Sequence, residues 1–260
     1  MTPHGAIIGH IDVAQLVLYV FWGFFASLVF YLHRENKREG YPLDSDRTDR
    51  APRVEVQGFP GVPSPKTFRL PHGEADVIAP NRIRDTRPIK GRPVADHPGA
   101  AIEPTGNPML DAIGPGSYAE RADVTDKALD GAPRIVPMRV ATDHWLPKED
   151  RDPIGFKVVG DDGVVAGLVS DVWVDRSECV ARYFEVTLTG GRHVMLPMNF
   201  SRVNDARAEV RVKSILGAQF ADVPALRNPD LITRLEEDKV CAYYGGGTLY
   251  ATPQRQEPLL

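Results

Sequence analysis

One arginine in a strand-like segment is the first residue of this sequence that could take part in chemistry. In CVARYFEVTL, at residues 179–188, Val180, Phe184, Val186 and Leu188 share one face at the period of two that is typical of a β-strand. Arg182 falls on the same apolar face, and a buried guanidinium without a partner is very costly, so it needs carboxylates nearby. The sequence offers several acids within reach, at Asp171, Asp175, Glu178, Glu236, Glu237 and Asp238.

Two interpretations of this pattern remain open. In the structural one, Arg182 forms an ion pair that only stabilises the fold, or it lies at a strand end from which its charge reaches water. In the functional one, the acids form a cluster with shifted pKa values that can carry protons.

Other kinds of catalytic or binding site find little support in the residues. The two cysteines, Cys179 and Cys241, lie far apart, and the seven histidines never pair at helical metal-ligand spacing, so no metal site is expected. The phosphate-binding and serine-nucleophile motifs are absent. A formal net charge of -4 argues against a nucleic-acid partner. The sequence therefore predicts no catalytic residues for substrate turnover.

The elements that position the acids form a β-rich C-terminal part. From Ile154 to Ile215, short β-prone runs alternate with Gly- and Asp-containing turns, which predicts a small antiparallel barrel or sandwich. Asn228-Pro229-Asp230 then resembles a helix start with proline in the first turn, and Gly245 to Gly247 are expected to end that helix.

The N-terminal part contains a segment suited to a membrane. Residues 13–32 carry no charge, and about 20 residues at roughly 1.5 Å rise each span the hydrocarbon core of a bilayer. A signal peptide would begin with basic residues and end in small ones, and a soluble core helix is rarely so uniformly apolar. Basic residues follow the segment and none precedes it, which predicts a periplasmic N-terminus and a cytoplasmic C-terminal side. We expect lipid headgroups to meet Arg34, Lys37, Arg38 and Tyr41.

These features divide the chain into four parts. We expect a periplasmic N-terminus at residues 1–11, a transmembrane helix at 12–33, an extended proline-rich cytoplasmic segment at 34–115, and a cytoplasmic β domain with a C-terminal helix at 116–260. More than half of the 23 prolines lie between residues 42 and 115, which disfavours long helices and central strands there. Disorder is one reading of this segment, and extended chain draped over a partner protein is the other.

Six stretches, spread in order over the whole chain, resemble the H subunit of the purple-bacterial photosynthetic reaction centre. They are FWGFFASLVFYLHRENKREGYPL (21–43), PKTFRLPHG (65–73), PTGNPMLDAIGP (104–115), IVPMRVA (135–141), VSDVWVDRSE (169–178) and LEEDKVCAYYGGGTLYA (235–251). The resemblance implies one membrane helix and a cytoplasmic PRC-barrel-like domain. It also implies a place in the inner, intracytoplasmic membrane of the cell, with the chain capping the L and M subunits.

The resemblance further implies which molecules belong to the partners. Bacteriochlorophyll, bacteriopheophytin, quinones and non-haem iron reside in the L and M subunits, and the H subunit ligates none of them. It shields the quinone region and supports proton delivery to the secondary quinone. A cytochrome subunit and a light-harvesting ring are candidate members of the same complex, and membrane lipids are expected around the helix.

Particular residues acquire a role through this resemblance. Family residues of the proton path match Asp175, Glu178 and Arg182, and a family glutamate in the final helix matches Glu237. Some relatives carry a surface histidine pair just before IVPMRVA, whereas this sequence has LDGAPR there, so an acidic mouth at Asp126 or Asp130 is expected instead.

Two other functions are alternatives to a reaction-centre subunit. A single-pass membrane adaptor could use a PRC-barrel-like domain to bind another cytoplasmic partner. A membrane-tethered enzyme would need a catalytic constellation, which the sequence lacks.

Overall fold

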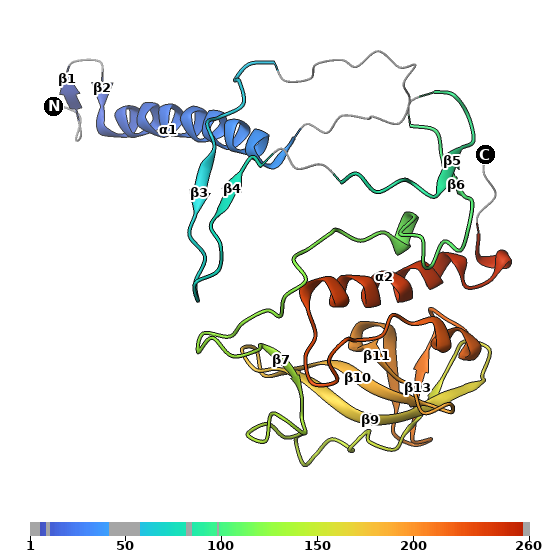
Figure 1. The fold of residues 1–260 in the computed structure, drawn as a ribbon. Coiled ribbons are helices and arrows are strands. Elements are labelled where there is room, and N and C mark those ends of the chain that lie inside the picture. Colours follow the sequence, from blue (N-terminus) through green and yellow to red (C-terminus); the bar gives the residue numbers. More distant parts are fainter. Residues whose placement is uncertain (1–5, 9–10, 42–57, 82–84, 98, 257–260) are drawn as a thin grey trace. The chain divides into compact units, whose positions relative to one another are not determined.

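The computed structural model describes residues 6–8, 11–41, 58–81, 85–97 and 99–256 of the chain (Figure 1). The chain divides into two compact units. The first comprises Met1–Arg84 and Asp96–Ala100, and the second comprises Asp85–Ala95 and Ala101–Leu260. The candidate proton-transfer residues all lie in the second unit.

The first unit is dominated by the helix α1, Val13–Asn36, which the 3₁₀ turn η1, Lys37–Glu39, extends. The carboxylate of Asp12 caps its N-terminus by accepting a hydrogen bond from the Gln15 amide at 2.7 Å, and Gly40 ends η1 at a φ of 90°. Among the described residues, Val13–Glu39 is the one helix long and apolar enough to cross a membrane, with a mean hydropathy of 2.0. The predicted N-terminal apolar helix is confirmed, and past residue 33, the predicted end of its membrane-spanning part, it continues to Asn36.

Two small hairpins complete the described part of the first unit. The strands β1, Ala6–Ile8, and β2, Ile11–Asp12, pair antiparallel just before α1. The strands β3, Lys66–Phe68, and β4, Val77–Ala79, form a second antiparallel pair.

A seven-stranded sheet forms the second unit. Its strands are β7 (Ile135–Pro137), β8 (Lys157–Val159), β9 (Val165–Asp175), β10 (Val180–Leu188), β11 (His193–Pro197), β12 (Ser201–Asn204) and β13 (Glu209–Val212). They follow the order β11-β10-β9-β8-β13-β12, and β7 also pairs with β9. All pairs are antiparallel except β8 with β13. The predicted mainly-β domain is confirmed, although the sheet is not closed in the described residues.

The long hairpin of β9 and β10 contains an irregularity that decides where Arg182 lies. Ala181 pairs with Val174 and Tyr183 pairs with Trp173, so Arg182 is an extra residue in β10. A bulge of this kind breaks the alternation of faces. Arg182 therefore does not share the apolar face of Phe184, as the period of two predicted, and its side chain is 42% exposed.

The helix α2, Arg234–Tyr250, lies along one face of the sheet (Figure 1). Its predicted start at Asn228-Pro229-Asp230 is wrong, because Thr233 caps the helix. The Thr233 hydroxyl accepts from the Glu236 amide at 3.1 Å, and the Glu236 carboxylate accepts from the Thr233 amide at 2.9 Å. This reciprocal capping satisfies two backbone donors at the first turn.

The three glycines expected to end the helix lie inside it. A Cβ atom on Gly247 would lie 2.4 Å from the Ser214 carbonyl oxygen, and one on Gly245 would lie 2.8 Å from the Pro115 carbonyl oxygen. The glycines therefore serve close packing of α2 against neighbouring backbone, and the predicted stop is wrong for that reason.

Short elements fill the remaining described parts of the second unit. The strands β5, Gly91–Pro93, and β6, Ile102–Pro104, form an antiparallel pair. The 3₁₀ turns are η2 (Gly114–Gly116), η3 (Met198–Phe200), η4 (Gly217–Asp222) and η5 (Pro253–Arg255). The core between sheet and helix contains fully buried Val172, Phe184, Leu196 and Tyr244, and the Tyr244 hydroxyl donates to the Met195 carbonyl at 3.0 Å.

Candidate functional site

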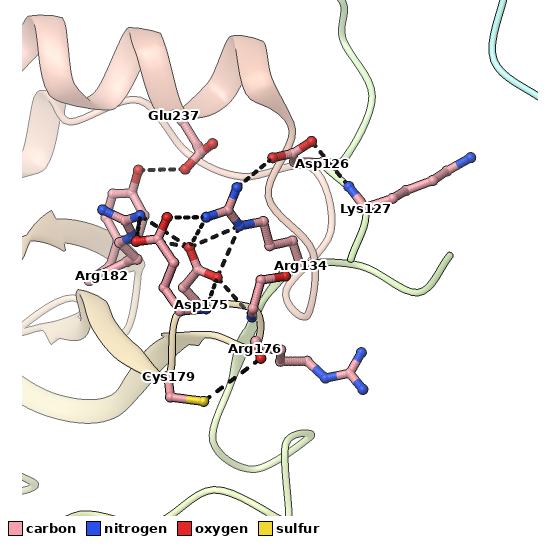
Figure 2. Close-up of polar contacts among 11 residues, drawn as sticks. Asp126, Lys127, Arg134, Asp175, Arg176, Cys179, Arg182 and Glu237 are labelled. Atoms are coloured by element: carbon pink, nitrogen blue, oxygen red, sulfur yellow. Dashed lines mark hydrogen bonds and ion pairs between the residues drawn. The ribbon is translucent and has the colours of Figure 1, made fainter. Parts of the chain in front are cut away.

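The turn between β9 and β10 brings the predicted acids and arginine together. Asp175 is the last residue of β9, Glu178 lies in the turn, and Arg182 lies at the bulge of β10. The short strand β7 pairs with the same end of β9, with Ile135 opposite Asp175. This pairing brings Arg134, directly before β7, into the same cluster (Figure 2).

Asp175 is the buried centre of this cluster, with a side-chain exposure of 0%. Both of its carboxylate oxygens lie 3.0 Å from Nε of Arg134, and Oδ2 accepts from Nη2 of Arg182 at 3.1 Å. Oδ1 also accepts from the backbone amides of Ser177, at 3.0 Å, and Glu178, at 3.1 Å. A buried carboxylate with this many donors has every lone pair engaged.

Glu178 links the same two arginines at the surface of the cluster. One of its carboxylate oxygens accepts from Nη2 of Arg134 at 2.6 Å, and the other accepts from Nη2 of Arg182 at 2.8 Å. Its side chain is 53% exposed. Two arginines and two carboxylates thus form a charge-balanced ring that is buried at Asp175 and exposed at Glu178. Figure 2 labels Asp175, Arg134 and Arg182 of this ring.

The electrostatics of Asp175 follow from this geometry. Burial raises its pKa, but the hydrogen bonds from Arg134, the Glu178 amide, Arg182 and the Ser177 amide outweigh burial and lower the pKa to about 2. Asp175 is therefore a carboxylate at neutral pH.

Glu237 lies on α2 and has a tyrosine as its hydrogen-bond partner. It accepts a hydrogen bond from the Tyr183 hydroxyl at 2.9 Å, and the same hydroxyl lies 4.0 Å from Sγ of Cys241. Burial raises the pKa of Glu237, and the bond from Tyr183 only partly opposes this. The structure thus places Glu237 beside the ring of Asp175 and Glu178, with Tyr183 as its hydrogen-bond donor (Figure 2).

The two acids expected at a proton mouth occupy different places. Oδ2 of Asp126 lies 3.5 Å from Nη1 of Arg134, so Asp126 extends the ring toward solvent. Asp130 instead pairs with Arg176 at 3.3 Å, and a hydrogen bond from the Ala132 amide lowers its pKa. Of the two, only Asp126 is joined to the cluster by an ion pair in the described residues.

A second cluster contains two buried acids, Asp171, which was expected near Arg182, and Glu185, which was not singled out from the sequence. Glu185 accepts from Nη1 of Arg139 at 2.6 Å, from Nε1 of Trp173 at 2.9 Å, and lies 2.8 Å from Nδ1 of His193. Arg139 also pairs with Asp171 at 2.9 Å, so Asp171 is not a partner of Arg182. A cavity of about 540 Å³ adjoins these side chains.

Two arginines of these clusters were missed from the sequence. Arg134 and Arg139 flank the β7 segment and reach acids 30 or more residues later in the chain. Pairing of β7 with β9 brings them there, and no local pattern predicts it. Glu185 had a weak signal, since it is an acid between Phe184 and Val186 in a β-strand.

The basic residues after α1 also differ from expectation. Nζ of Lys37 donates to the carbonyl oxygens of Gly58, at 3.0 Å, and Pro60. Arg38 donates to the Ala79 carbonyl at 3.2 Å and to Glu35 at 2.9 Å. Both side chains are buried and hold other segments of the first unit, and contact with lipid headgroups stays a prediction for the four residues. Of the four expected lipid contacts, only two are exposed, Arg34 and Tyr41.

No group of three or more His, Cys, Asp or Glu residues suited to a metal ion occurs among the described residues.

Two family models match the chain. One, described as the photosynthetic reaction centre H-chain N-terminal region, matches residues 5–140, which is just over half of the chain. The other, the PRC-barrel domain, matches residues 148–218. The second match contains β8 to β13, and with them Asp175, Glu178 and Arg182. The first contains α1 and Arg134.

Proposed function

This chain belongs to the photosynthetic reaction centre H-chain family, and from that membership we propose that it delivers protons toward the secondary quinone while it caps the core subunits. In such a complex a quinone that takes up two electrons also takes up two protons. A capping domain that excludes water must then supply side chains that carry them. The ring of Asp175, Glu178, Arg134 and Arg182 is the observation that supports this role.

The residues of the ring and Glu237 have different roles in this proposal. Asp175, with a pKa of about 2, stays ionised and fixes the two arginines. Glu178 is held by both arginines and yet reaches water, so it is suited to exchange protons with solvent. Burial raises the pKa of the half-buried Glu237 carboxyl, which makes it a better proton acceptor than an exposed glutamate. Water molecules could bridge the steps between these groups.

The first unit supports the anchoring part of the proposal. The side chains of α1 are exposed and apolar, as lipid or a neighbouring membrane helix would require. We propose that the N-terminus is periplasmic, that the remainder is cytoplasmic, and that the membrane is the inner, intracytoplasmic one.

The family implies association with the reaction-centre core subunits. We propose that the L and M subunits hold the bacteriochlorophyll, bacteriopheophytin, quinones and non-haem iron, and that this chain ligates none of them and shields the quinone sites. A cytochrome subunit and a light-harvesting ring are proposed as further members of the complex.

Purification tests the assembly part of the proposal. A tagged chain isolated from its native membrane in mild detergent should carry a pigmented complex that absorbs in the near infrared. A colourless preparation would instead favour a single-pass adaptor with a PRC-barrel-like binding domain. The proton-delivery part is tested in the pigmented complex by Glu178→Gln, which should slow the second electron transfer to the secondary quinone and leave the first unchanged.

A further inference from the structure

We propose that Arg134 is a positioning residue of the proton-delivery cluster, which couples exposed Asp126 to Glu178 through the fixed anion Asp175. The inference rests on the proposed function. It adds one residue to the proton path and proposes that protons enter from the side of Asp126. Arg134 does not itself exchange protons, because a guanidinium stays charged at any physiological pH.

The contacts of the Arg134 guanidinium carry this inference. Nε binds both oxygens of Asp175 at 3.0 Å. Nη2 binds Asp175 at 2.8 Å and Glu178 at 2.6 Å. Nη1 faces Asp126 at 3.5 Å. Three carboxylates are thus held by the three nitrogens of one planar group, which the single nitrogen of a lysine could not reproduce.

The backbone of Arg134 is held as firmly as its side chain. Its amide donates to the Asp126 carbonyl at 2.8 Å, and its carbonyl accepts from the Arg176 amide at 2.9 Å. These bonds tie the Asp126 segment on one side and the turn after β9 on the other. The guanidinium therefore lies between the two segments with little freedom to move.

Arg182 does not duplicate this role. It contacts Asp175 and Glu178 from the β10 side, and its ion-pair partners among the described residues do not include Asp126. Without Arg134, Asp175 would keep Arg182 and its two amide donors. Glu178 would lose the donor to one oxygen, and Asp126 would lose its contact with the ring.

The charge environment sets the sign of the pH effect. Within the ring the remaining cation is Arg182, and Asp126 pairs with Arg134 at 3.5 Å. On α2, Glu237 accepts from Tyr183, and Asp238 pairs with Arg121 at 3.3 Å. The Arg176 side chain points away from the ring and pairs with Asp130 at 3.3 Å (Figure 2). Removal of Arg134 takes one cation from this set. The carboxylates then bind protons at higher pH, because an adjacent cation favours their ionised form.

The test uses the assembled pigmented complex and three variants, Arg134→Gln, Arg134→Lys and Arg211→Gln. Arg211 is the matched control, since it is half-exposed and pairs with Glu209 at 3.0 Å, away from the ring. The measurement is the rate of the second electron transfer from about pH 5 to about pH 9, which brackets the operating pH near which proton-transferring groups work best.

Arg134→Gln should slow this step several-fold at neutral pH and move its pH profile upward by about one pH unit. Arg134→Lys should restore the wild-type pH profile, because it keeps the positive charge. Its second electron transfer should remain slower than in wild type, because a lysine lacks the three nitrogens that hold the three carboxylates. Arg211→Gln should match wild type. Rates and profiles equal to wild type in the Arg134 variants would overturn the inference. If Arg134→Gln does not assemble, the rate of Arg134→Lys decides: a slower rate supports the inference and a wild-type rate overturns it.

Glu178→Gln, measured in parallel, separates two kinds of failure. If Glu178→Gln behaves as wild type, the cluster is not on the proton path and the proposed function fails. If Glu178→Gln is slow but the Arg134 variants behave as wild type, the path stands and only the positioning role of Arg134 fails.

Discussion

The guanidinium of Arg134 lies with Nε 3.0 Å from each carboxylate oxygen of Asp175, although 41 residues separate the two in the chain. The pairing of β7 with β9 creates this contact, because Ile135 lies opposite Asp175. The proposed proton path therefore combines residues of the PRC-barrel sheet with residues of the segment that precedes it.

Loss of the Asp175 charge should destabilise the chain. Asp175→Asn leaves Arg134 and Arg182 without their shared buried carboxylate, so we expect the free energy of unfolding to fall by about 3 to 5 kcal/mol. Circular dichroism melting of the full-length chain in detergent measures this. Asp130→Asn, in an exposed pair with Arg176, is the control and should melt like wild type.

The same carboxylate predicts an acid-sensitive fold. The pKa of Asp175 is about 2 in the folded chain and near its ordinary value of about 3.9 when unfolded. Its stabilisation is therefore complete above about pH 5 and is lost as the pH falls toward 2. The melting temperature of wild type should fall steeply as the pH is lowered over that range, and the melting temperature of Asp175→Asn should fall less steeply. Equal slopes would contradict the low pKa.

Arg139 makes a second prediction about buried charge. It pairs with Glu185 at 2.6 Å and Asp171 at 2.9 Å, and it also holds Asp230 at 3.0 Å. Burial raises the pKa of Glu185, but Arg139, Trp173 and His193 outweigh burial and lower it overall. Arg139→Met should therefore destabilise the chain by about 3 kcal/mol at pH 7.

The pH dependence identifies the cause of that loss. With the cation gone, burial dominates and the pKa of Glu185 rises above its unfolded value. The folded variant then binds a proton more readily than the unfolded chain. Acidification toward pH 5 should therefore reduce the difference in free energy of unfolding between the variant and wild type. A deficit that stays constant between pH 7 and pH 5 would show that lost packing, and not buried charge, accounts for the effect.

Close packing of α2 makes a prediction of a different kind. A Cβ on Gly247 would lie 2.4 Å from both the Ser214 carbonyl oxygen and Cγ2 of Ile215. Gly247→Ala should therefore destabilise the chain by about 1 to 3 kcal/mol, even though alanine favours helices by about 1 kcal/mol over glycine. Gly190→Ala, with nothing within 4 Å of its Cβ, should be tolerated. A melting temperature for Gly247→Ala at or above wild type would refute the close approach.

The hydrogen bond from Tyr183 to Glu237 can be tested by infrared spectroscopy. Tyr183→Phe removes a donor that favours ionised Glu237, so the pKa of Glu237 should rise further and a protonated carboxyl band should persist to higher pH. Tyr243→Phe is the control, because its hydroxyl donates to the Gln219 carbonyl and not to an acid. An unchanged band in Tyr183→Phe would place Glu237 outside this contact.

The sequence predicted those parts of the site that a single hairpin brings together. Asp175, Glu178 and Arg182 lie within eight consecutive residues, so one turn between two strands makes them neighbours. The sequence also predicted the N-terminal apolar helix and the β-rich domain, since length, hydropathy and turn residues are local signals.

The predictions that were wrong or missing concern contacts between residues that lie far apart in the chain. Arg134 reaches Asp175 only because β7 pairs with β9. Gly245 to Gly247 look like a helix end, yet tertiary packing keeps them helical. The bulge at Arg182 changes its face without a sequence signal, and Lys37 finds carbonyl partners more than 20 residues away. Local propensity does not contain this information.

The central claim, proton delivery through this cluster, is tested most directly by Glu178→Gln in the assembled pigmented complex. The rates of the first and second electron transfers to the secondary quinone are measured after successive light flashes at neutral pH, with exposed Glu149→Gln as the matched control. The account predicts a several-fold slower second transfer in Glu178→Gln, an unchanged first transfer, and wild-type rates in Glu149→Gln. Equal second-transfer rates in Glu178→Gln and wild type would contradict it.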